Sequence, residues 1–179
     1  MQDAYMANKF KPLIQIVTLI TVITTVIWIG YSSPFARHAP DISFPLLDGR
    51  ELSLDSLAGK TVLVTFWAST CVECRKEMPD LIALYNELSG SGFEIIGVAM
   101  PYDPPNRVLE TSELMDIPYP VALDIYGNAV KAFGDVAVTP SSFLISPGGE
   151  IVVHQVGSLD TTQLRKRVTD LLAAEQHNI

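Results

Sequence analysis

The sequence contains few of the residues on which small secreted and metal-binding proteins depend. Cysteine occurs twice, at Cys71 and Cys74. A disulfide-rich scaffold needs several bridges, and two cysteines this close together cannot tie distant segments of the chain to each other. A structural zinc site needs several ligands at characteristic spacings, whereas the histidines are scattered at His38, His154 and His177. We therefore expect no disulfide scaffold, no metal, and no cofactor apart from the cysteine pair itself.

Positive charge is also scarce. The chain has 12 Lys and Arg against 20 Asp and Glu, which gives a formal net charge of −8. Since no basic face and no interleaving of basic and aromatic residues is visible, we expect no nucleic-acid partner. Hydrophobic residues make up 48% of the chain, which argues against disorder. The part of the chain beyond residue 40 has a length that suits one domain with a single core.

One long apolar run stands near the N-terminus. No charged residue occurs from Leu13 to Ile29, and a helix of this length nearly matches a hydrocarbon core of about 30 Å. Trp28 and Tyr31 lie where aromatic residues gather at a membrane interface. The run predicts a single transmembrane anchor at residues 13–31, which follows a cytoplasmic segment at 1–12 and precedes a linker at 32–40.

The basic residues beside this run indicate its orientation. Lys9 and Lys11 precede it and Arg37 follows it, which predicts a cytoplasmic N-terminus and a domain on the outer side of the inner membrane. Two other interpretations stay open. A cleaved signal peptide would have a shorter apolar region and a small-x-small cleavage site, and the residues that follow offer no such site. A buried core helix would show a polar face.

Residues 41–179 carry alternating strand and helix signals. The run from Thr61 to Trp67 is β-branched and aromatic on both faces, as in a buried central strand. Asp160 is placed to cap the last helix, Gly90 to end the helix that begins at the cysteines, and Pro79 to kink it. We expect strands at 42–47, 61–67, 93–99, 119–123, 142–145 and 150–156, and helices at 71–88, 107–115, 128–133 and beyond Asp160. This order predicts an α/β domain with a mixed central sheet and helices on both of its faces.

The residues that carry chemistry lie where the first buried strand leads into the first long helix. Residues 66–79 read F-W-A-S-T-C-V-E-C-R-K-E-M-P. The free N–H groups and the positive dipole end of a helix start stabilise an anion, so Cys71 should form a thiolate more readily than a free cysteine does. Cys74, one turn further along, can attack the mixed disulfide that Cys71 forms and release the product. The pair therefore indicates thiol–disulfide exchange.

The block W-A-S-T-C-V-E-C-R-K-E-M-P resembles the active site of the TlpA/ResA-like family, whose members are membrane-attached, thioredoxin-fold proteins of the bacterial cell envelope. The resemblance extends from about Asp41 to Leu172 and implies a thioredoxin-like fold for the domain. A second block, V-T-P-S-S-F-L-I-S-P-G-G-E-I, is similar to the segment that bears the cis-proline of that fold. It implies that Pro140 is the cis-proline and that the backbone of Thr139 binds an extended substrate chain. Trp67 is expected beside the dithiol, either in contact with substrate or as a core aromatic.

The chain departs from the family pattern near the cysteines. Thr70 stands where many relatives carry Trp, and it or Ser69 is expected to cap the helix. Thr65 stands where thioredoxins carry a buried Asp, which leaves the acceptor of the Cys74 proton unassigned. Glu73 lies between the cysteines, where its charge opposes thiolate formation and can tune the pKa of the pair. A solvated charge at the helix start is an equally good interpretation of Glu73.

Together these features predict an extracytoplasmic enzyme that reduces disulfide bonds in envelope proteins. Cys71 attacks, Cys74 resolves, and a membrane thiol–disulfide electron donor regenerates the dithiol. The resemblance implies substrates such as apocytochrome c awaiting haem attachment, or other periplasmic proteins with mispaired cysteines. Two alternatives stay open: an oxidase or isomerase of the same fold, and a copper-delivery protein, although the latter use a wider cysteine spacing and a histidine ligand. A peroxidase would need a proline–threonine frame ahead of its cysteine, and Thr70 adjoins Cys71 directly.

Overall fold

The computed structural model describes residues 37–176 and, within the N-terminal segment, Thr21 and Thr24. The chain divides into two compact units, residues 1–36 and residues 37–179. The expected cytoplasmic segment, the anchor apart from those two threonines, and most of the linker lie outside the described residues. Among the residues that are described, no helix is both long enough and apolar enough to cross a bilayer.

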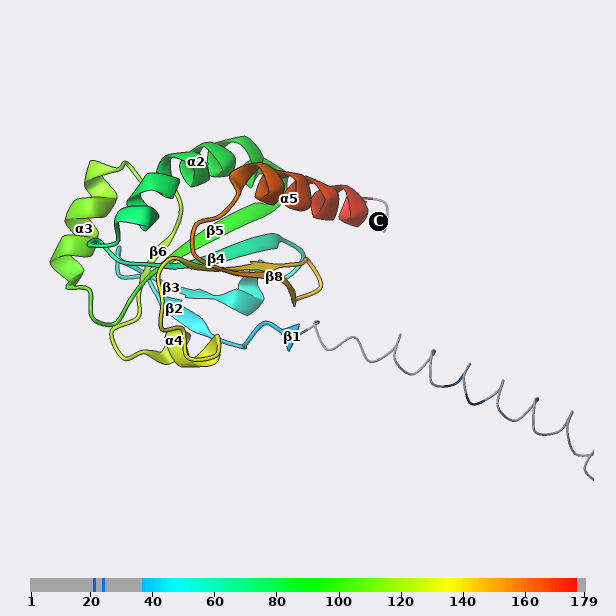
Figure 1. The fold of residues 1–179 in the computed structure, drawn as a ribbon, viewed down its shortest axis with the longest axis horizontal. Helices are drawn as coiled ribbons and strands as arrows, with labels where there is room; N and C mark the ends of the chain where they lie inside the picture. Colours follow the sequence, from blue (N-terminus) through cyan, green and yellow to red (C-terminus); the bar gives the residue numbers. More distant parts are fainter. Residues whose placement is uncertain (1–20, 22–23, 25–36, 177–179) are drawn as a thin grey trace, which may run out of the picture. The chain divides into compact units, whose positions relative to one another are not determined.

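A six-stranded sheet forms the centre of the domain (Figure 1). Two neighbouring strands inside the sheet are parallel to each other, and a third strand continues the parallel part at one edge. The other side of the sheet is antiparallel, so the sheet is mixed as expected. In spatial order the strands are β1 (Arg37–His38), β8 (Glu150–Val156), β7 (Ser141–Ile145), β4 (Thr61–Trp67), β5 (Phe93–Ala99) and β6 (Val121–Leu123).

Strand β4 lies in the interior along its whole length, since all seven of its residues are buried. Successive side chains of a strand point to opposite faces, so a central strand of a two-sided sheet must be apolar on both. Val62, Val64 and Phe66 join the core on one face. Leu63 and Trp67 join the clusters on the other. The prediction of a buried central strand at 61–67 is confirmed.

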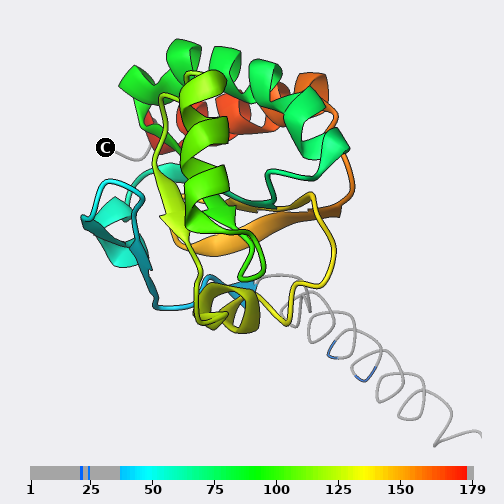
Figure 2. The same ribbon diagram turned by 90° about the vertical axis from the view of Figure 1, so that its left-hand side faces the viewer.

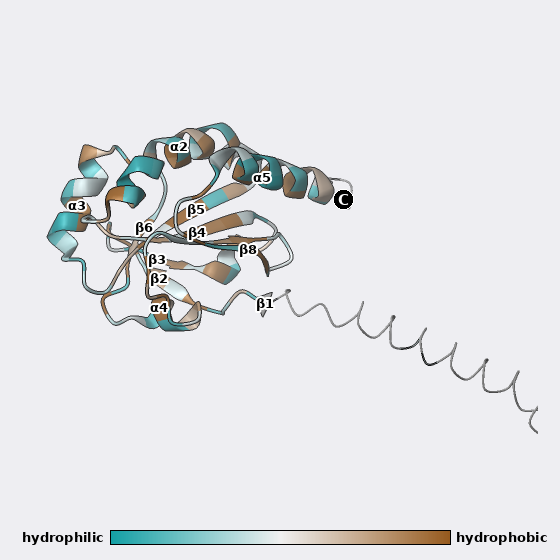
Figure 3. Ribbon diagram, viewed as in Figure 1, coloured by the Kyte–Doolittle hydropathy of each residue, from teal (hydrophilic) through white to brown (hydrophobic). Residues whose placement is uncertain are grey.

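Helices cover both faces of the sheet, as Figures 1 and 2 show. One face carries α2 (Val72–Leu88) and α5 (Thr161–Gln176), and α3 (Pro105–Leu114) lies near the outer parallel strand. The opposite face carries α4 (Asn128–Ala132) and a separate hairpin. That hairpin consists of β2 (Ser43–Pro45) and β3 (Glu51–Ser53), and the short 3-10 helix η1 (Leu54–Leu57) follows it. Figure 3 shows the hydrophobic residues of the strands gathered between these layers.

Most of the expected elements form within a few residues of the expected bounds, but the end of α2 differs. Ser89 ends the helix, and the chain continues as a 3-10 turn, η2 (Ser89–Ser91). The left-handed residue is therefore Gly92, with φ of 96°, and not Gly90 as the pattern predicted. Pro79 lies inside α2 without ending it. The capping role expected of Asp160 is confirmed, because its carboxylate accepts the N–H groups of Thr162 and Gln163, each at 3.0 Å.

Candidate active site

The strand register brings four loops to one edge of the sheet. Trp67, Ala99 and Leu123 are paired residues at the carboxyl ends of β4, β5 and β6. Phe66 pairs with Ser141, so the antiparallel strand β7 begins at the same edge. The loops that start or end there contain the cysteines, residues 100–104, residues 124–127 and residues 138–140. Ligands and reacting groups commonly gather at the carboxyl edge of parallel strands.

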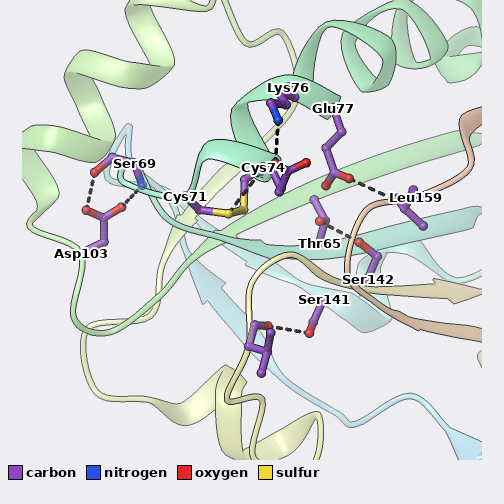
Figure 4. Close-up of a disulfide and its surroundings, with 12 residues drawn as sticks. Thr65, Ser69, Cys71, Cys74, Lys76, Glu77, Asp103, Ser141, Ser142 and Leu159 are labelled. Carbon is purple, nitrogen blue, oxygen red and sulfur yellow. Dashed lines mark hydrogen bonds and ion pairs between the residues drawn. A yellow bond between two sulfur atoms is a disulfide. The ribbon is translucent and has the colours of Figure 1, made fainter.

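Cys71 and Cys74 are joined by a disulfide bond, with their Cα atoms 5.3 Å apart (Figure 4). The two sulfur-bearing residues are unequally accessible. Cys71 is half-buried, whereas Cys74 is 1% exposed and packs with Trp67 and Met78. A bulky partner can therefore reach Cys71 but not Cys74. This asymmetry supports the order of attack that the sequence predicts.

The sulfur of Cys71 caps helix α2. Cys71 is the N-cap residue, and its Sγ accepts the N–H of Cys74 at 3.2 Å. The expectation that Ser69 or Thr70 caps the helix is therefore wrong: Ser69 bonds elsewhere, and the sulfur occupies the capping position. An N–H group at a helix start carries part of the positive end of the helix dipole. A Cys71 thiolate would accept this bond more strongly than a neutral thiol, which favours ionisation.

Asp103 holds the loop that precedes the cysteines. Its carboxylate accepts the Ser69 N–H at 2.5 Å and the Ser69 hydroxyl at 2.6 Å (Figure 4). Asp103 is 6% exposed and lies in the proline-rich loop after β5. The prolines in the sequence indicate a loop there, either a plain surface loop or part of a substrate groove, and do not indicate this contact. The available signal was its position, because loops after neighbouring parallel strands meet at the same edge of the sheet.

Trp67 is 2% exposed and lies beneath the dithiol, in one cluster with Cys74, Met78 and Val108. The sequence predicts Trp67 beside the dithiol, either in contact with substrate or as a core aromatic. The structure places it in the core, where a substrate chain cannot reach its side chain. Its contribution to the site is the packing that supports the first turn of α2.

Glu77 is a buried carboxyl group that the sequence patterns did not single out. It is 7% exposed, stands one turn beyond Cys74 on α2, and accepts the Leu159 N–H at 3.1 Å (Figure 4). Burial raises its pKa above the ordinary value, the hydrogen bond from Leu159 partly offsets this, and the charge of Glu73 adds to the rise. The signal in the sequence was a glutamate on the same helix face as Met78 and Leu81.

Thr65 stands where thioredoxins carry a buried aspartate, and Ser142 is its partner on the neighbouring strand β7. Their hydroxyl groups are 2.9 Å apart and both residues are buried, at 3% and 1% exposed (Figure 4). A hydroxyl can pass a hydrogen bond along, but a neutral hydroxyl is far too weak a base to hold a proton taken from a thiol. Among the carboxyl groups described on α2, Glu77 is the one that is buried and has a raised pKa.

Glu73 lies on the outer side of the helix start. Its carboxylate pairs with Lys76 Nζ at 2.6 Å, and the two side chains are 56% and 65% exposed. An exposed pair of this kind contributes little to stability. Its proposed influence on the thiol pKa stays a prediction, and water and Lys76 both weaken the field that Glu73 exerts on Cys71.

The Thr139–Pro140 peptide bond is cis. Pro140 is buried, Thr139 is half-buried, and the preceding Val138 is 54% exposed. The Val138 carbonyl accepts the Ser141 hydroxyl at 2.6 Å, which fixes this turn at the start of β7 (Figure 4). The segment thus lies at the same edge of the sheet as the cysteines, and the substrate-binding role that the resemblance implies for Thr139 and Pro140 stays a prediction.

Exposed apolar side chains surround this edge. They belong to four loops or element ends: Val72 at 54%, Tyr102 at 62%, Ile125 at 56%, Tyr126 at 83% and Val138 at 54% exposed. A pocket of about 100 Å³ lies between the loops after β5 and β6, lined by Pro101, Tyr102, Pro104 and Ile125 among others. Apolar groups held in water next to a reactive group are typical of a surface that binds a partner. Among the described residues, no three His, Cys, Asp or Glu side chains are grouped as metal ligands.

Comparison with known proteins agrees with this geometry. The AhpC/TSA family model matches residues 35–154. The thiol-disulfide oxidoreductase ResA of Bacillus thuringiensis subsp. konkukian is 31% identical over 131 residues, which cover 73% of this chain and 74% of that protein. ResA of Halalkalibacterium halodurans is 32% identical over 129 residues, with 72% of each chain covered.

Solved structures give the same result. A thiol:disulfide interchange protein of the thioredoxin family from Chlorobium tepidum superposes with a TM-score of 0.71 at 28% identity, covering 76% of this chain and 97% of its own. The thioredoxin domain of a thiol-disulfide oxidoreductase from Bacteroides vulgatus gives 0.66 at 29% identity, covering 75% and 97%. With its dithiol at the start of α2, the chain therefore belongs to the AhpC/TSA family and is, within it, a thiol–disulfide oxidoreductase of the ResA/TlpA-like type with a thioredoxin fold.

Proposed function

We propose that this enzyme reduces disulfide bonds in other proteins outside the cytoplasm. The observation that carries the proposal is the unequal access to the two sulfurs, because a half-buried Cys71 can meet a substrate disulfide while Cys74 is held 1% exposed behind it. The apolar residues around Cys71 suit a polypeptide better than a small thiol. The relatives named ResA support the exchange chemistry.

The reaction would proceed in two exchanges. The Cys71 thiolate attacks one sulfur of the substrate disulfide, which forms a mixed disulfide and releases the other substrate sulfur as a thiolate. The Cys74 thiolate then attacks Cys71 Sγ, which forms the 71–74 disulfide and releases the second substrate sulfur. The substrate gains two electrons and the enzyme dithiol loses them. A dithiol donor must return the enzyme to its reduced form, and we propose a membrane thiol–disulfide protein for this role.

Glu77 would serve the second exchange. Cys74 must lose a proton before it can attack, and its burial disfavours the thiolate. Glu77 stands one turn away on the same helix, and its raised pKa makes it a better proton acceptor than an ordinary glutamate. Val138, Thr139 and Pro140 would border the bound chain, with the backbone of Thr139 as its hydrogen-bonding partner.

Two measurements test this function on the purified full-length protein in detergent. Reduced enzyme should accelerate the reduction of insulin by dithiothreitol, and Cys71→Ala should abolish the acceleration. The reduction potential, set against glutathione, should lie near the thioredoxin value of about −270 mV. A potential far above that value would instead favour the opposite direction, an oxidase or isomerase. The hydrogen bond from Cys74 N–H to Cys71 Sγ supports that second candidate, because it stabilises the thiolate and hence the reduced enzyme.

A trapping experiment would identify the substrates. In cells that express Cys74→Ala, the first exchange can occur but the second cannot, so substrate proteins should accumulate on Cys71. Cys71→Ala is the matched control and should capture few. Equal capture by both variants would contradict the assigned order of attack.

Location and substrate need tests of their own. We propose an inner-membrane anchor at residues 13–31 with the catalytic domain in the periplasm or its equivalent, and apocytochrome c as one substrate. After mild reduction, a membrane-impermeant maleimide should label Cys71 in spheroplasts without lysis. Loss of the gene should lower covalently bound haem, and added dithiothreitol should restore it. Labelling that requires lysis would contradict the outward placement.

A further inference from the structure

We propose that Asp103 is a positioning residue for Cys71: its buried carboxylate fixes the turn that presents the attacking sulfur, and its charge lowers the tendency of that sulfur to ionise. The proposal depends on thiol–disulfide exchange at Cys71 but not on its direction, so it stands whether the enzyme reduces or oxidises its substrates.

The Asp103 carboxylate is in direct contact with Ser69. Both carboxylate oxygens of Asp103 bind Ser69, one through the backbone N–H at 2.5 Å and one through the hydroxyl at 2.6 Å. The two residues are 34 positions apart in the chain and come from loops after different strands. Hydrogen bonds to an ionised carboxylate are shorter and stronger than those between neutral groups. Figure 4 shows the pair on the side of Cys71 away from Cys74.

A tight turn connects Ser69 to Cys71. The Cys71 N–H donates to the Ala68 carbonyl at 3.0 Å, so residues 68–71 form one tight turn with Ser69 inside it. Cys71 is then the N-cap of α2. Fixing both polar groups of Ser69 therefore fixes the direction from which Cys71 enters the helix. In the described part of the chain, Asp103 is the one side chain from outside residues 68–71 that has a hydrogen bond to this turn.

The backbone on both sides of Asp103 is held in place. The Asp103 N–H donates to the Met100 carbonyl at 2.9 Å, and the Met100 N–H donates to the Trp67 carbonyl at 3.0 Å. After Asp103 come Pro104 and Pro105, and Pro105 begins α3. The carboxylate is thus attached to the end of β4 on one side and to a helix on the other. Rigid support of this kind is what holds a reacting atom in a productive direction.

Charge gives the contact a second effect. A fixed carboxylate near a thiol disfavours the thiolate, in opposition to the helix start that favours it. Four other charged side chains lie at this end of α2, and they stay the same in every variant proposed below: Glu73, Arg75, Lys76 and Glu77. Asp124, in the loop after β6, carries a further negative charge at the same edge of the sheet and is varied separately from Asp103. The adjacent Tyr102 is 62% exposed, so a partner that touches this loop touches the element that holds Cys71.

A plain structural role is the competing explanation, and the chain offers a matched control for it. Asp124 is also 6% exposed, also follows a parallel strand at the same edge, and also accepts two hydrogen bonds. Its partners are the Ala129 and Val130 N–H groups, at 3.0 and 2.8 Å. It therefore supports α4 and not the turn before Cys71. Replacing either aspartate should cost stability, but only replacing Asp103 should change the thiol.

The experiment uses full-length protein in a Cys74→Ala background, so that one thiol remains. Two properties are measured: the melting temperature and the pH dependence of Cys71 alkylation by iodoacetamide. The variants compared are Asp103→Asn, Asp103→Ala, Ser69→Ala, Ser69→Thr, Asp124→Asn and Asp124→Ala. The rate of mixed-disulfide formation with oxidised insulin is measured alongside. This rate requires a correctly directed sulfur, whereas alkylation by a small reagent depends mainly on the thiolate fraction.

Both Asp103 variants should move the alkylation midpoint to lower pH, because a negative charge is removed. Asp103→Ala should also slow mixed-disulfide formation about tenfold at a fixed thiolate fraction, and Asp103→Asn should slow it less, because an amide can still accept the Ser69 N–H. Ser69→Ala should slow it without lowering the midpoint, and Ser69→Thr should restore it.

The proposal is overturned if the Asp103 variants match the Asp124 variants in both midpoint and mixed-disulfide rate. Should the Asp103 variants fail to fold, Ser69→Ala decides: a rate within twofold of the parent overturns the proposal, and a loss that Ser69→Thr reverses supports it. Failure of the parent enzyme to reduce insulin would contradict the reductive function. Equal reaction of all variants would contradict the positioning role.

Discussion

The indole of Trp67 lies directly against the backbone of Gly97. A β-carbon at residue 97 would stand 3.2 Å from Trp67 Nε1 and 3.2 Å from Tyr119 Cε2, closer than side chains normally approach. Gly97 lies on β5, paired with Thr65 of the neighbouring strand β4. The absence of a side chain at residue 97 therefore makes room for the ring on which the first turn of α2 rests.

Gly97→Ala should destabilise the domain, because the added methyl must displace Trp67 or Tyr119 in a closely packed core. Overpacking of this kind costs about 1–3 kcal/mol. Denaturant unfolding followed by tryptophan emission measures the effect, in a Trp28→Phe background so that Trp67 alone reports. Gly90→Ala is the control, since nothing lies within 4 Å of a β-carbon there. A loss for Gly97→Ala no larger than for the control would contradict the tight contact.

Glu77 should make the stability of the protein depend on pH. Burial raises its folded pKa above the ordinary 4.5. The native state then binds its proton more tightly than the unfolded state does, so this group favours folding below pH 4.5 and the benefit is lost as pH rises through the folded pKa. Glutamine does not titrate, and its amide oxygen can still accept the Leu159 N–H. Glu77→Gln should therefore gain in melting temperature over the parent as pH rises from 4 to 8.

Melting curves of both proteins at several pH values test this expectation. Glu110→Gln, at an exposed position of α3, is the control and should track the parent at every pH. The difference in melting temperature between Glu77→Gln and the parent could instead be constant with pH, or shrink as pH rises. Either result would show that the folded protein does not raise the pKa of Glu77.

The same substitution should slow the second exchange. If Glu77 accepts the Cys74 proton, Glu77→Gln should lower the rate at which the 71–74 disulfide re-forms from a preformed mixed disulfide, by about 10² at neutral pH. The deficit should narrow towards pH 9, where hydroxide removes the proton directly. Stopped-flow release of a chromogenic thiol from Cys71 measures the step. Formation of the mixed disulfide should change little, and equal slowing of both steps would contradict the assignment.

The exposed apolar residues at the dithiol edge should matter for protein substrates only. Replacing Tyr102 and Tyr126 together by Ser should raise KM for insulin several-fold and leave the reaction with glutathione disulfide unchanged, because the small substrate does not reach them. Leu114→Ser is the control: it is 81% exposed, but it lies at the far end of α3, about 13 Å of helix from Pro105. An equal effect on both substrates would argue against a polypeptide-binding surface.

The sequence was sufficient to predict the elements that local patterns encode. The period of apolar residues located β4, β5 and α2, and the cysteine spacing at a strand–helix junction located the dithiol. What it could not supply were contacts between distant positions. Ser69 and Asp103 are 34 residues apart, and Glu77 and Leu159 are 82 apart. No periodicity links such pairs, and only the strand register brings them together.

Two smaller errors have local causes. Ser and Thr are in general better capping residues than Cys, so Ser69 and Thr70 were the natural candidates. In the structure the Ser69 hydroxyl donates to Asp103 instead, and Cys71 Sγ accepts the N–H group at the helix start. Trp67 was expected beside the dithiol, and contact with substrate was one of the two interpretations. In the structure it alternates to the covered face of β4 and is enclosed by α2 and α3. The expected membrane anchor stays a prediction, since residues 13–31 lie almost wholly outside the described part.

The sulfur that performs the chemistry is also the cap of the helix that carries it. A charged thiolate accepts the Cys74 N–H more strongly than a sulfur locked in a disulfide, so gaining two electrons tightens the first turn of α2. In a closed thermodynamic cycle, the folding free energies of the reduced and the oxidised chain differ by a certain amount. The free energy of reduction differs by the same amount between the native protein and the unfolded chain. Any change that stabilises this turn more in one redox state than in the other, even one remote from both cysteines, therefore shifts the electrochemical driving force of the enzyme.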